Sequence, residues 1–337
     1  MIWYFPDWSF MDWATGPGNA LILIFALILD GIIGDPRWFP HPVRGIGIII
    51  QLFDKVLNRS IFSETLKKAL GLLTVIFIVG AMFVAGWFLG GYAKSIPYCW
   101  LIELFFITIL MAQRSMVDHA TLVVTQMRHN GISGGRAAVG LIVGREVSKL
   151  DEKGISRATI ESTAESFTDG VFAPIFWYLL LGLPGLFAYK SISTLDSMVG
   201  YKTTKYMAFG MAAAKTDDFA SWIPARIAGL IIAFAAIFIP GASFRGAFSI
   251  FFRDSRNHSS PNAGYTEAAM AGALGLRLLG PRKYSGVISE DTRWLGAGAK
   301  DANKDDIIQA IKIFSVACFI TGVLVAILAV IIQFSIS

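Results

Sequence analysis

Charged residues are scarce in this sequence. Only 16% of its 337 residues are Asp, Glu, Lys or Arg, whereas 55% are hydrophobic, and the mean hydropathy is +0.59. Soluble domains carry roughly 25% charged residues, so the composition places the chain in the membrane class. Two runs, 69–90 and 313–334, contain 22 residues each without a charge. At about 1.5 Å per helical residue, each run can cross a hydrocarbon core about 30 Å thick.

Cysteine is nearly absent too. Cys99 and Cys318 lie far apart in apolar segments, so they predict neither a disulfide framework nor a CxxC metal site. The four histidines include no pair at zinc-ligand spacing, and no GxxxxGK[ST] phosphate loop occurs, so neither a zinc site nor a Walker A loop is predicted. Residues 1–19 contain no Lys or Arg, so they lack the basic region of a cleavable signal peptide.

The basic residues are spread unevenly along the chain. Residues 1–34 contain none, 35–68 contain six, 69–112 contain one, and 113–170 contain seven. The net charge of +5 is therefore interpreted as the positive-inside bias of a multi-pass cell-membrane protein. Because the basic residues form no cluster with an aromatic platform, no nucleic-acid partner is predicted. The pattern predicts an external extension at 1–19 and polar loops on the cytoplasmic side.

We therefore expect an all-α, polytopic membrane protein with one membrane domain over 20–337. Its four expected full spans are 20–34, 69–90, 97–112 and 313–334. The apolar segments 171–189 and 227–241 are shorter and contain prolines. We expect both to be re-entrant or buried in protein, with LGLPG at 181–185 as a turn, although full crossing stays open.

Two acids, Asp30 and Glu103, fall inside predicted spans. Intramembrane acids are either functional or shielded by neighbouring groups. If they line a pathway, the chain is a transporter, which is one alternative interpretation. Transporters often contain paired repeats with matching broken helices, and no internal repeat is found in this sequence.

Three acids, Glu161, Glu165 and Asp169, follow one another at i, i+4 and i+8. On a helix they share one face, where like charges repel unless a cation lies between them. The spacing suggests a Mg²⁺ site, because this hard ion takes carboxylate and phosphate oxygens. The alternative is a solvated helix face with Arg157 as counter-ion.

A second acidic motif, Asp217-Asp218, precedes an apolar segment. At most one of two adjacent helical carboxylates can face a given ion. A lipid-diphosphate transferase, the second alternative, would carry a DDxxD motif, but Ser221 and Trp222 occupy the distal stretch.

Two polar loops could bind anions. In 35–47, three prolines restrain the backbone and could hold Asp35, His41 and Arg44 in a fixed array; the alternative is a juxtamembrane turn. In 253–262, basic groups lie beside Ser and Asn, as in an anion nest. His258 in this loop is either a base or a structural hydrogen-bonding group.

Several of these motifs occur together and in order between about residues 30 and 312. They are GDPRWFPHPVRGIG, VGRE, RATIESTAESFTDGVFAP, YKSISTLDSMVGYK, TDDFASWIPAR, RDSRNHSSPN and EAAMAGALGLRLLGP. With them the sequence strongly resembles the CbiB/CobD family of cobalamin biosynthesis, the adenosylcobinamide-phosphate synthases.

The resemblance implies an ATP- and Mg²⁺-dependent ligase that forms a C–N bond. It would join the free propionate of adenosylcobyric acid, a corrinoid, to (R)-1-amino-2-propanol or its O-phosphate. Activation of the carboxylate as an acyl phosphate would need cationic groups around the phosphoryl group, and the amine would need a base. Implied partners are the lipid bilayer and other membrane-associated cobalamin-assembly enzymes.

Under this resemblance the polar residues take three roles. The expected Mg²⁺ ligands are Glu161, Glu165 and Asp169, with Asp217 or Asp218. The expected catalytic residues are His258 or His41 as base, Asp196 and Lys202. The expected substrate- or phosphate-binding residues are Asp35, Arg44, Arg145, Lys190, Arg226, Arg253, Ser260 and Asn262.

The sequence also departs from the family pattern. Ser166, Ser193 and Ser221 stand where Asn is common, Glu146 replaces Asp, and Leu279 replaces Gly. A Ser hydroxyl cannot supply both the donor and the acceptor arm of an Asn amide, so the three serines can replace only part of the hydrogen bonding of Asn.

Overall fold

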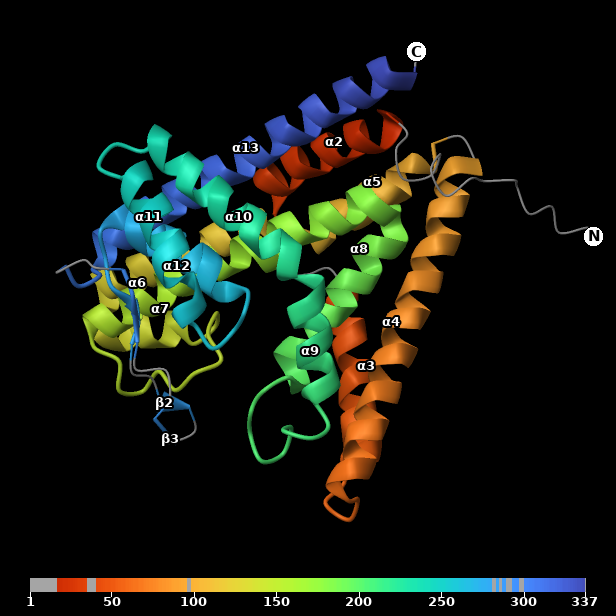
Figure 1. Ribbon diagram of the computed structural model, residues 1–337, viewed down its shortest axis with the longest axis horizontal. Helices are drawn as coiled ribbons and strands as arrows, with labels where there is room; N and C mark the ends of the chain where they lie inside the picture. Colours follow the sequence, from red (N-terminus) through yellow and green to blue (C-terminus); the bar gives the residue numbers. More distant parts are fainter. Residues whose placement is uncertain are drawn as a thin grey trace, which may run out of the picture.

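The computed structural model describes residues 17–34, 41–95, 98–280, 283–284, 287–288, 293–296 and 300–336. Most of the predicted extension at 1–19 and the predicted site residue Asp35 lie outside these ranges. The described helices are α2 (Pro17–Ile33), α3 (Pro42–Leu57), α4 (Glu64–Ser95), α5 (Trp100–Leu110), α6 (Gln113–Val139), α7 (Glu152–Phe167), η1 (Thr168–Phe172), α8 (Ala173–Val199), α9 (Met211–Ala220), α10 (Trp222–Ala235), η2 (Ala236–Phe238), α11 (Phe244–Asp254), η3 (Ser255–Asn257), α12 (Ala263–Leu274) and α13 (Lys304–Ile336) (Figure 1).

Strands are few and short. β1 (Leu278–Leu279) pairs antiparallel with β4 (Trp294–Leu295), and β2 (Lys283–Tyr284) pairs antiparallel with β3 (Val287–Ile288). All four lie between α12 and α13. The all-α prediction is confirmed, with these two-residue pairs as a local addition.

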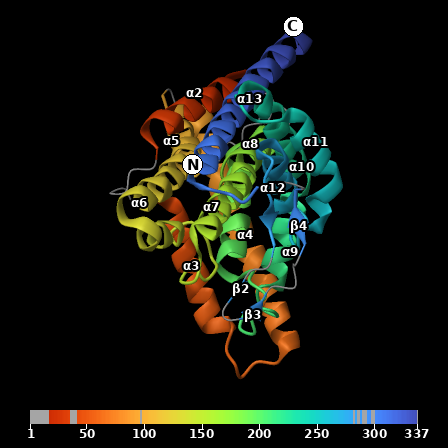
Figure 2. The same ribbon diagram turned by 90° about the vertical axis from the view of Figure 1, so that its left-hand side faces the viewer.

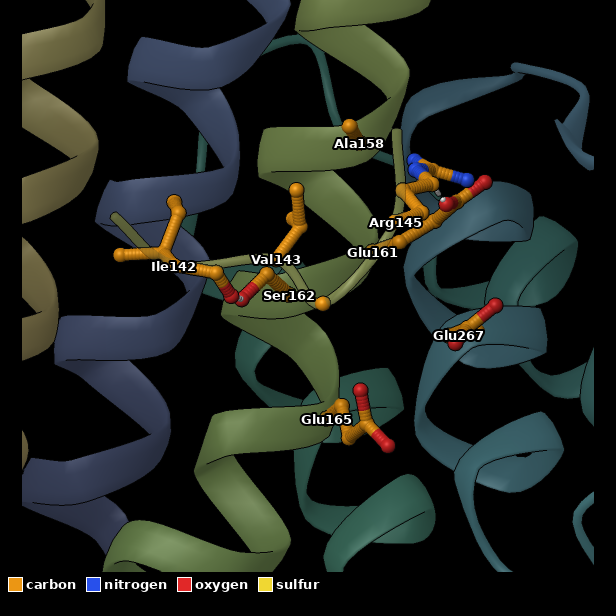
Figure 3. A pocket seen from close by; sticks show the side chains of 9 residues that line it. Ile142, Val143, Arg145, Ala158, Glu161, Ser162, Glu165 and Glu267 are labelled. Atoms are coloured by element: carbon orange, nitrogen blue, oxygen red, sulfur yellow. Dashed lines mark hydrogen bonds and ion pairs between the residues drawn. The ribbon is translucent and has the colours of Figure 1, made fainter. Parts of the chain in front are cut away.

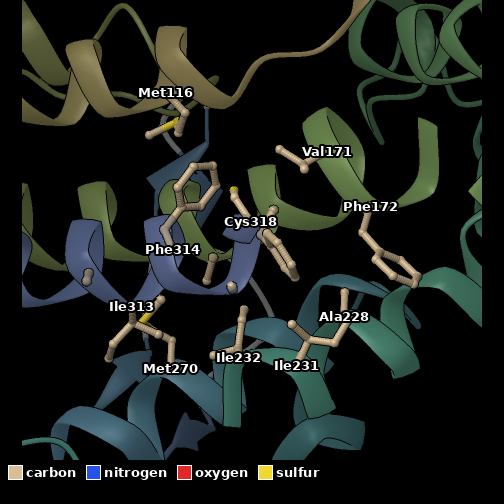
Figure 4. Close-up of a cluster of buried hydrophobic side chains, with 14 of the residues drawn as sticks. Met116, Val171, Phe172, Ala228, Ile231, Ile232, Met270, Ile313, Phe314 and Cys318 are labelled. Atoms are coloured by element: carbon tan, nitrogen blue, oxygen red, sulfur yellow. The ribbon is translucent and has the colours of Figure 1, made fainter. Parts of the chain in front are cut away.

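The main hydrophobic core joins α7, α10, α12 and α13. In Figure 4, Phe314 and Cys318 of α13 face Val171, while Met270 and Ile232 come from the helices below. Small residues let the helices of this core approach closely, as is usual in membranes. For example, a Cβ atom added to Gly272 of α12 would lie 2.3 Å from the carbonyl oxygen of Gly246 in α11.

A second core holds a projecting helical hairpin. α3 and α4 extend away from the body in both views (Figures 1 and 2). Ile46 and Ile50 of α3 and Val75 of α4 pack there against Leu195 at the end of α8 and Phe209 beyond it. The hairpin is therefore fixed to the C-terminal half of α8.

The predicted turn at 181–185 is present. Gly182 has φ 64° and ψ −148° inside α8, a backbone conformation that favours glycine. Pro184 follows, and a Cβ atom on Gly86 of α4 would lie 2.7 Å from the Pro184 backbone. The two halves of α8 diverge from this break in Figure 1.

A side-chain contact shows how far α8 turns. The Tyr189 hydroxyl donates to Asp169 Oδ1 at 3.3 Å. Twenty residues of unbroken helix would separate these positions by about 30 Å. The segment 171–189 therefore enters and returns, which supports the re-entrant interpretation over full crossing.

The other apolar segments agree with the prediction in part. By length and apolar content, four helices could span a membrane: Glu64–Ala93, Trp100–Val139, Glu152–Val199 and Lys304–Ile331. They overlap three of the four predicted spans, 69–90, 97–112 and 313–334. The fourth, 20–34, forms a shorter apolar helix, Ala20–Ile33, and α9 with α10 forms a pair bent by 52°. The predicted short segment 227–241 overlaps the second helix of this bent pair, which ends at Phe238.

The two intramembrane acids are shielded. Asp30 accepts a hydrogen bond from the Gln113 backbone N–H at 2.9 Å, at the start of α6. Glu103 accepts one from the Tyr178 hydroxyl at 2.8 Å, with both side chains buried. Each acid connects two helices through a hydrogen bond. Shielding by neighbouring groups therefore accounts for both acids, and no transport pathway is needed to explain them.

Replacing Tyr178 with Phe should lower the midpoint of thermal unfolding in detergent. The change removes a hydrogen bond to a buried carboxylate, which costs about 1–3 kcal/mol. Tyr92→Phe, at an exposed position on α4, is the matched control and should shift the midpoint little. Equal shifts in the two variants would contradict the assigned role of Tyr178.

Candidate functional site

The polar motifs meet where α7, α9, α12 and the C-terminal half of α8 approach one another. One part is a cavity of about 110 Å³, here called the acidic cavity. It is lined by Ile142, Val143, Gly144, Arg145, Ala158, Glu161, Ser162, Glu165 and Glu267. Figure 3 shows Glu161 and Glu165 on α7, with Glu267 on the neighbouring α12.

A buried ion pair forms one wall of this cavity. Arg145 Nη2 donates to Glu161 Oε2 at 2.8 Å, and both side chains are less than 10% exposed. Glu161 Oε1 accepts from the Leu279 backbone N–H at 2.7 Å. The pair therefore connects the loop before α7, α7 itself and β1.

Leu279 adopts a left-handed conformation to make this contact. Its φ is 68°, which is unusual for a residue with a Cβ atom, and the side chain is 1% exposed. This is the position where the resemblance predicts Gly. Burial of the Leu279 side chain thus offsets the strain of its left-handed backbone.

These contacts change the interpretation of the three acids on α7. Both oxygens of Glu161 are engaged by Arg145 and Leu279, so this carboxylate has a structural role in the described geometry. Glu165 lines the cavity and interacts electrostatically with Asp169 and Asp217. It therefore joins the cavity to a second group of acids.

This second group, here called the carboxylate cluster, consists of Asp169, Asp196, Asp217 and Asp218. Asp217 interacts electrostatically with the other three. Two lysines neutralise part of the charge: Lys190 interacts with Asp169, and Lys202 with Asp218. Asp169, Asp196, Asp217 and Asp218, which come from three separate sequence motifs, therefore lie near one another.

Two neutral hydroxyls order the cluster. The buried Tyr189 hydroxyl lies 3.1 Å from Ser221 Oγ and also reaches Asp169. Ser221 therefore retains a hydrogen bond despite replacing the usual Asn. Asp217 Oδ1 is buried and has no hydrogen-bond partner within the described part of the chain.

The loop 253–262 closes one side of the cluster. Asn262 Nδ2 donates to the Asp218 carbonyl oxygen at 2.9 Å. Ser260 Oγ accepts from the backbone N–H groups of Asn262 and Ala263, at 3.3 and 3.2 Å. Ser260 thus accepts from the N–H of Ala263, the first residue of α12, and Asn262 connects α12 to the end of α9.

His258, which belongs to this loop, lies beside Glu267 of the acidic cavity. Its Nδ1 accepts from the Ser260 backbone N–H at 2.8 Å, and its Nε2 lies 3.6 Å from Glu267 Oε1. The arrangement assigns the proton of the neutral ring to Nε2, facing a buried carboxylate. His258 is therefore the better placed of the two predicted bases.

His41 has a structural role instead. Its Nδ1 accepts from the Val43 backbone N–H at 3.1 Å as the N-cap of α3, and its Nε2 donates to the Ile109 carbonyl oxygen at 2.7 Å. With both ring nitrogens occupied, the prediction of His41 as base is not supported. Arg44, one turn into α3, is exposed to the exterior.

Two further arginines predicted to bind anions, Arg226 and Arg253, differ in availability. The Arg226 guanidinium lies over the rings of Trp222 and Tyr265, 3.9 and 4.3 Å from their centroids. It also donates to the Trp222 carbonyl oxygen. Arg253 makes two hydrogen bonds to Asp254, at 2.7 and 2.6 Å, so its guanidinium is largely committed to that carboxylate.

Glu267 is the functional candidate that sequence reasoning missed. It is a single acid in α12, a helix otherwise built from small and apolar residues, and it is 2% exposed. The argument applied to Asp30 and Glu103 would have selected it, because an isolated acid in an apolar helix needs a reason. Glu267 begins the motif EAAMAGALGLRLLGP, which supports the family resemblance and suggests no chemical role by itself.

The metal prediction stays a prediction. Among the described residues, no three His, Cys, Asp or Glu side chains are arranged to hold a metal ion. The acids of the carboxylate cluster are close enough to interact but do not form a preorganised ligand set.

A family model described as CobD/CbiB protein matches residues 23–314. The chain belongs to the CobD/CbiB family. A cobalamin biosynthesis protein CobD from Sinorhizobium sp. is 42% identical over 321 residues, covering 92% of this chain and 98% of the relative. The CobD of Brucella anthropi is 44% identical over 318 residues, covering 91% and 96%. The CbiB of Salmonella arizonae is 40% identical over 297 residues, covering 88% and 92%.

Membership in the CobD/CbiB family confirms the resemblance drawn from the motifs. The family match encloses the acidic cavity and the carboxylate cluster. These relatives are all named cobalamin biosynthesis proteins. No solved structure gives a significant match to the chain.

The strain at Leu279 gives a stability test. Leu279→Gly and Leu279→Ala lose comparable packing, but only Gly adopts φ 68° without strain. The Gly variant should therefore be more stable than the Ala variant by about 1 kcal/mol. Thermal unfolding in detergent measures the difference. If the Ala variant is the more stable, the left-handed backbone at this position is wrong.

Asp254 gives a pH test. Hydrogen bonds from Arg253, and a further one from the Gly296 N–H, hold the pKa of the Asp254 carboxyl below its usual range. A lowered folded-state pKa adds stability at pH values above the unfolded pKa, about 3.9, and this is lost as pH falls through the folded pKa.

Asp254→Asn should therefore lower the unfolding midpoint at pH 7, and its difference from wild type should shrink below about pH 4. Asp305→Asn removes an exposed carboxylate and serves as control, with little expected change. A difference that grows on acidification would contradict the stated contacts of Asp254.

Proposed function

We propose that this CobD/CbiB protein is an ATP-dependent ligase of cobalamin biosynthesis. It joins the free propionate of adenosylcobyric acid to (R)-1-amino-2-propanol or its O-phosphate through an amide bond. The observation that carries the proposal is the convergence of the family motifs on two adjoining sites. Glu165 faces both, so an amine site and a carboxylate-activation site can share one reaction centre.

The proposed reaction has two chemical steps. The propionate oxygen attacks the γ-phosphorus of ATP, giving an acyl phosphate and ADP. The amine nitrogen then attacks the acyl carbon, which releases inorganic phosphate and leaves the amide. The first step brings together several negative charges, so the site must supply cations.

The chemistry of the carboxylate cluster, without a preformed ligand geometry among the described residues, would suit a hard divalent cation. Asp217 Oδ1 is buried without a hydrogen-bond partner within the described chain, and four carboxylates meet there. Mg²⁺ prefers such oxygen ligands and keeps several waters or phosphate oxygens. Asp169, Asp217 and Asp218, with Glu165, would hold Mg²⁺, which would neutralise charge on the phosphoryl oxygens.

Basic residues near the carboxylate cluster would bind the anionic groups of the substrates. Lys190 and Lys202 lie beside the cluster and would bind phosphate oxygens. Arg226, held flat against two aromatic rings, presents its remaining N–H groups for a carboxylate or phosphate. His258, paired with Glu267, would accept the proton that the amine loses.

The membrane placement follows the charge pattern. Asn262 and Asp218 join the loop 253–262 to the end of α9, so both polar segments lie on one side of the protein. With the basic-residue bias, we assign this side to the cytoplasm, where ATP is present, and the protein to the cell membrane.

The direct test is to incubate the detergent-purified protein with adenosylcobyric acid, Mg-ATP and each amine in turn. We expect ADP release that depends on both the corrinoid and one amine, together with a cobinamide product identified by mass. ADP release without a corrinoid product would contradict the ligase assignment.

In this assay, Asp217→Asn should lower kcat about 100-fold or more, because a charge that stabilises the phosphoryl transition state is lost. Asp118→Asn, at an exposed position on α6, is the control and should keep the wild-type rate. Wild-type activity of Asp217→Asn would remove Asp217 from the site.

A further inference from the structure

The loop 200–210, which joins α8 to α9, lies next to the α3–α4 hairpin. Figure 1 shows it in green beneath α9. Its two ends meet, because a Cβ atom on Gly210 would clash with the Val199 carbonyl oxygen. At its start, the Gly200 N–H donates to the carbonyl oxygen of Asp196, a member of the carboxylate cluster, at 2.7 Å. Compact surface loops with adjoining ends are frequently functional, and this one begins at the proposed reaction centre.

Asp54 of α3 anchors the C-terminal half of this loop. Its Oδ2 accepts from Lys205 Nζ at 2.7 Å and from the Tyr206 hydroxyl at 3.2 Å. Asn58 Nδ2 donates to Asp54 Oδ1 at 2.9 Å and to the Lys205 carbonyl oxygen at 3.2 Å. An isolated surface ion pair contributes little, but here several donors converge on a carboxylate whose side chain is 14% exposed. This carboxylate therefore fixes the second half of the loop to the hairpin.

α4 holds the same half of the loop from another side. A Cβ atom on Gly71 would clash with the Phe209 carbonyl oxygen, so α4 and the loop are in close backbone contact. The Phe209 side chain is buried in the second core. Within the loop, the Tyr206 N–H donates to the Thr203 carbonyl oxygen at 3.0 Å, and the Thr203 N–H donates to that of Tyr201 at 2.8 Å. These turns connect the anchored half to the first residues of the loop.

The first residues of the loop reach both parts of the candidate site. A Cβ atom on Gly144 would lie 3.1 Å from the Tyr201 hydroxyl oxygen, so the Tyr201 ring lies against this glycine. Gly144 lines the acidic cavity. The next residue, Lys202, interacts electrostatically with Asp218 of the carboxylate cluster. Two consecutive residues of the loop therefore bridge the acidic cavity and the carboxylate cluster.

The hairpin itself lies outside the candidate site. In the described structure, neither the residues that line the acidic cavity nor the four acids of the carboxylate cluster belong to α3 or α4. An effect of Asp54 on the reaction must therefore pass through contacts of the hairpin with other segments. Loop 200–210 provides such a contact, because one half binds the hairpin and the other half touches the site.

We propose that Asp54 is a positioning residue of the reaction centre. It acts through loop 200–210, whose anchored half holds Tyr201 at the acidic cavity and Lys202 at the carboxylate cluster. This inference rests on the proposed function, since it gives a residue outside the site a part in the same reaction.

Hydrogen exchange followed by mass spectrometry tests the contact path without any substrate. In the full chain in detergent, Asp54→Ala should speed amide exchange several-fold in 201–209 and also in 142–146, the segment that Tyr201 contacts. Glu64→Ala removes an exposed acid of the same hairpin, which pairs with Lys67. It is the matched control and should leave both segments unchanged. Faster exchange confined to 201–209, or no change in either segment, would overturn the inference.

Two further variants keep the test informative if Asp54→Ala does not fold. Asp54→Asn still accepts a hydrogen bond through its amide oxygen but loses the charge that holds Lys205, so it should speed exchange in the same two segments. Asp54→Lys combined with Lys205→Asp restores opposite charges and should return the exchange of 142–146 towards the wild-type rate. Failure of the exchanged pair to recover, with the protein folded, would count against the role of this ion pair.

Kinetics separate the inference from the proposed function. Asp54→Asn should lower kcat of the ligase reaction on the order of tenfold, with smaller changes in the KM values, whereas Glu64→Ala should keep the wild-type rate. Wild-type kcat in Asp54→Asn would leave Asp54 a structural residue only, so the inference would be wrong while the ligase proposal stands. If the wild-type protein forms no cobinamide, the ligase proposal fails, and the exchange of 142–146 still decides whether Asp54 orders this part of the site.

Discussion

The structure depends on keeping ionised groups satisfied inside an apolar helical protein. The ion pair between Arg145 and Glu161 shows this most clearly, because both side chains are almost fully buried. Such a pair adds little net stability over apolar packing, but loss of one partner leaves an uncompensated charge. It fixes the loop before α7 and β1 against α7, and β1 accepts a left-handed Leu279 to complete it. The pair also forms one wall of the acidic cavity.

The need to satisfy buried charges also separates the buried acids into two kinds. Asp30 and Glu103 each accept a hydrogen bond from a neighbouring helix, so each carboxylate connects two helices. Asp217, in contrast, keeps a buried oxygen without a hydrogen-bond partner in the described chain, and the surrounding carboxylates repel it. The structural acids thus have donors from neighbouring helices, whereas the carboxylate cluster combines several acids with a buried oxygen that lacks a hydrogen-bond partner in the described chain.

Much of this organisation is predictable from the sequence. Apolar length identifies α4 and α13, the LGLPG motif predicts the turn in α8, and the motifs together predict the family. The roles of single residues are harder, because they depend on which helices become neighbours. Glu161 and Asp169 share a helical stripe but lie about 12 Å apart along the axis, so they meet different partners. His41 looks like a catalytic residue until Ile109, distant in sequence, accepts its N–H.

The reversal at Gly182 has a consequence for how the protein sits in its membrane. Since Tyr189 returns to Asp169, the apolar hairpin between them begins and ends at the same depth, and its tip packs against Gly86 of α4. The re-entrant segment 171–189 therefore packs at its tip against α4, a helix long and apolar enough to span a membrane. Because helices adapt to bilayer thickness by tilting, a tilt of α4 would act first on the tip of this segment, where Gly86 meets Pro184.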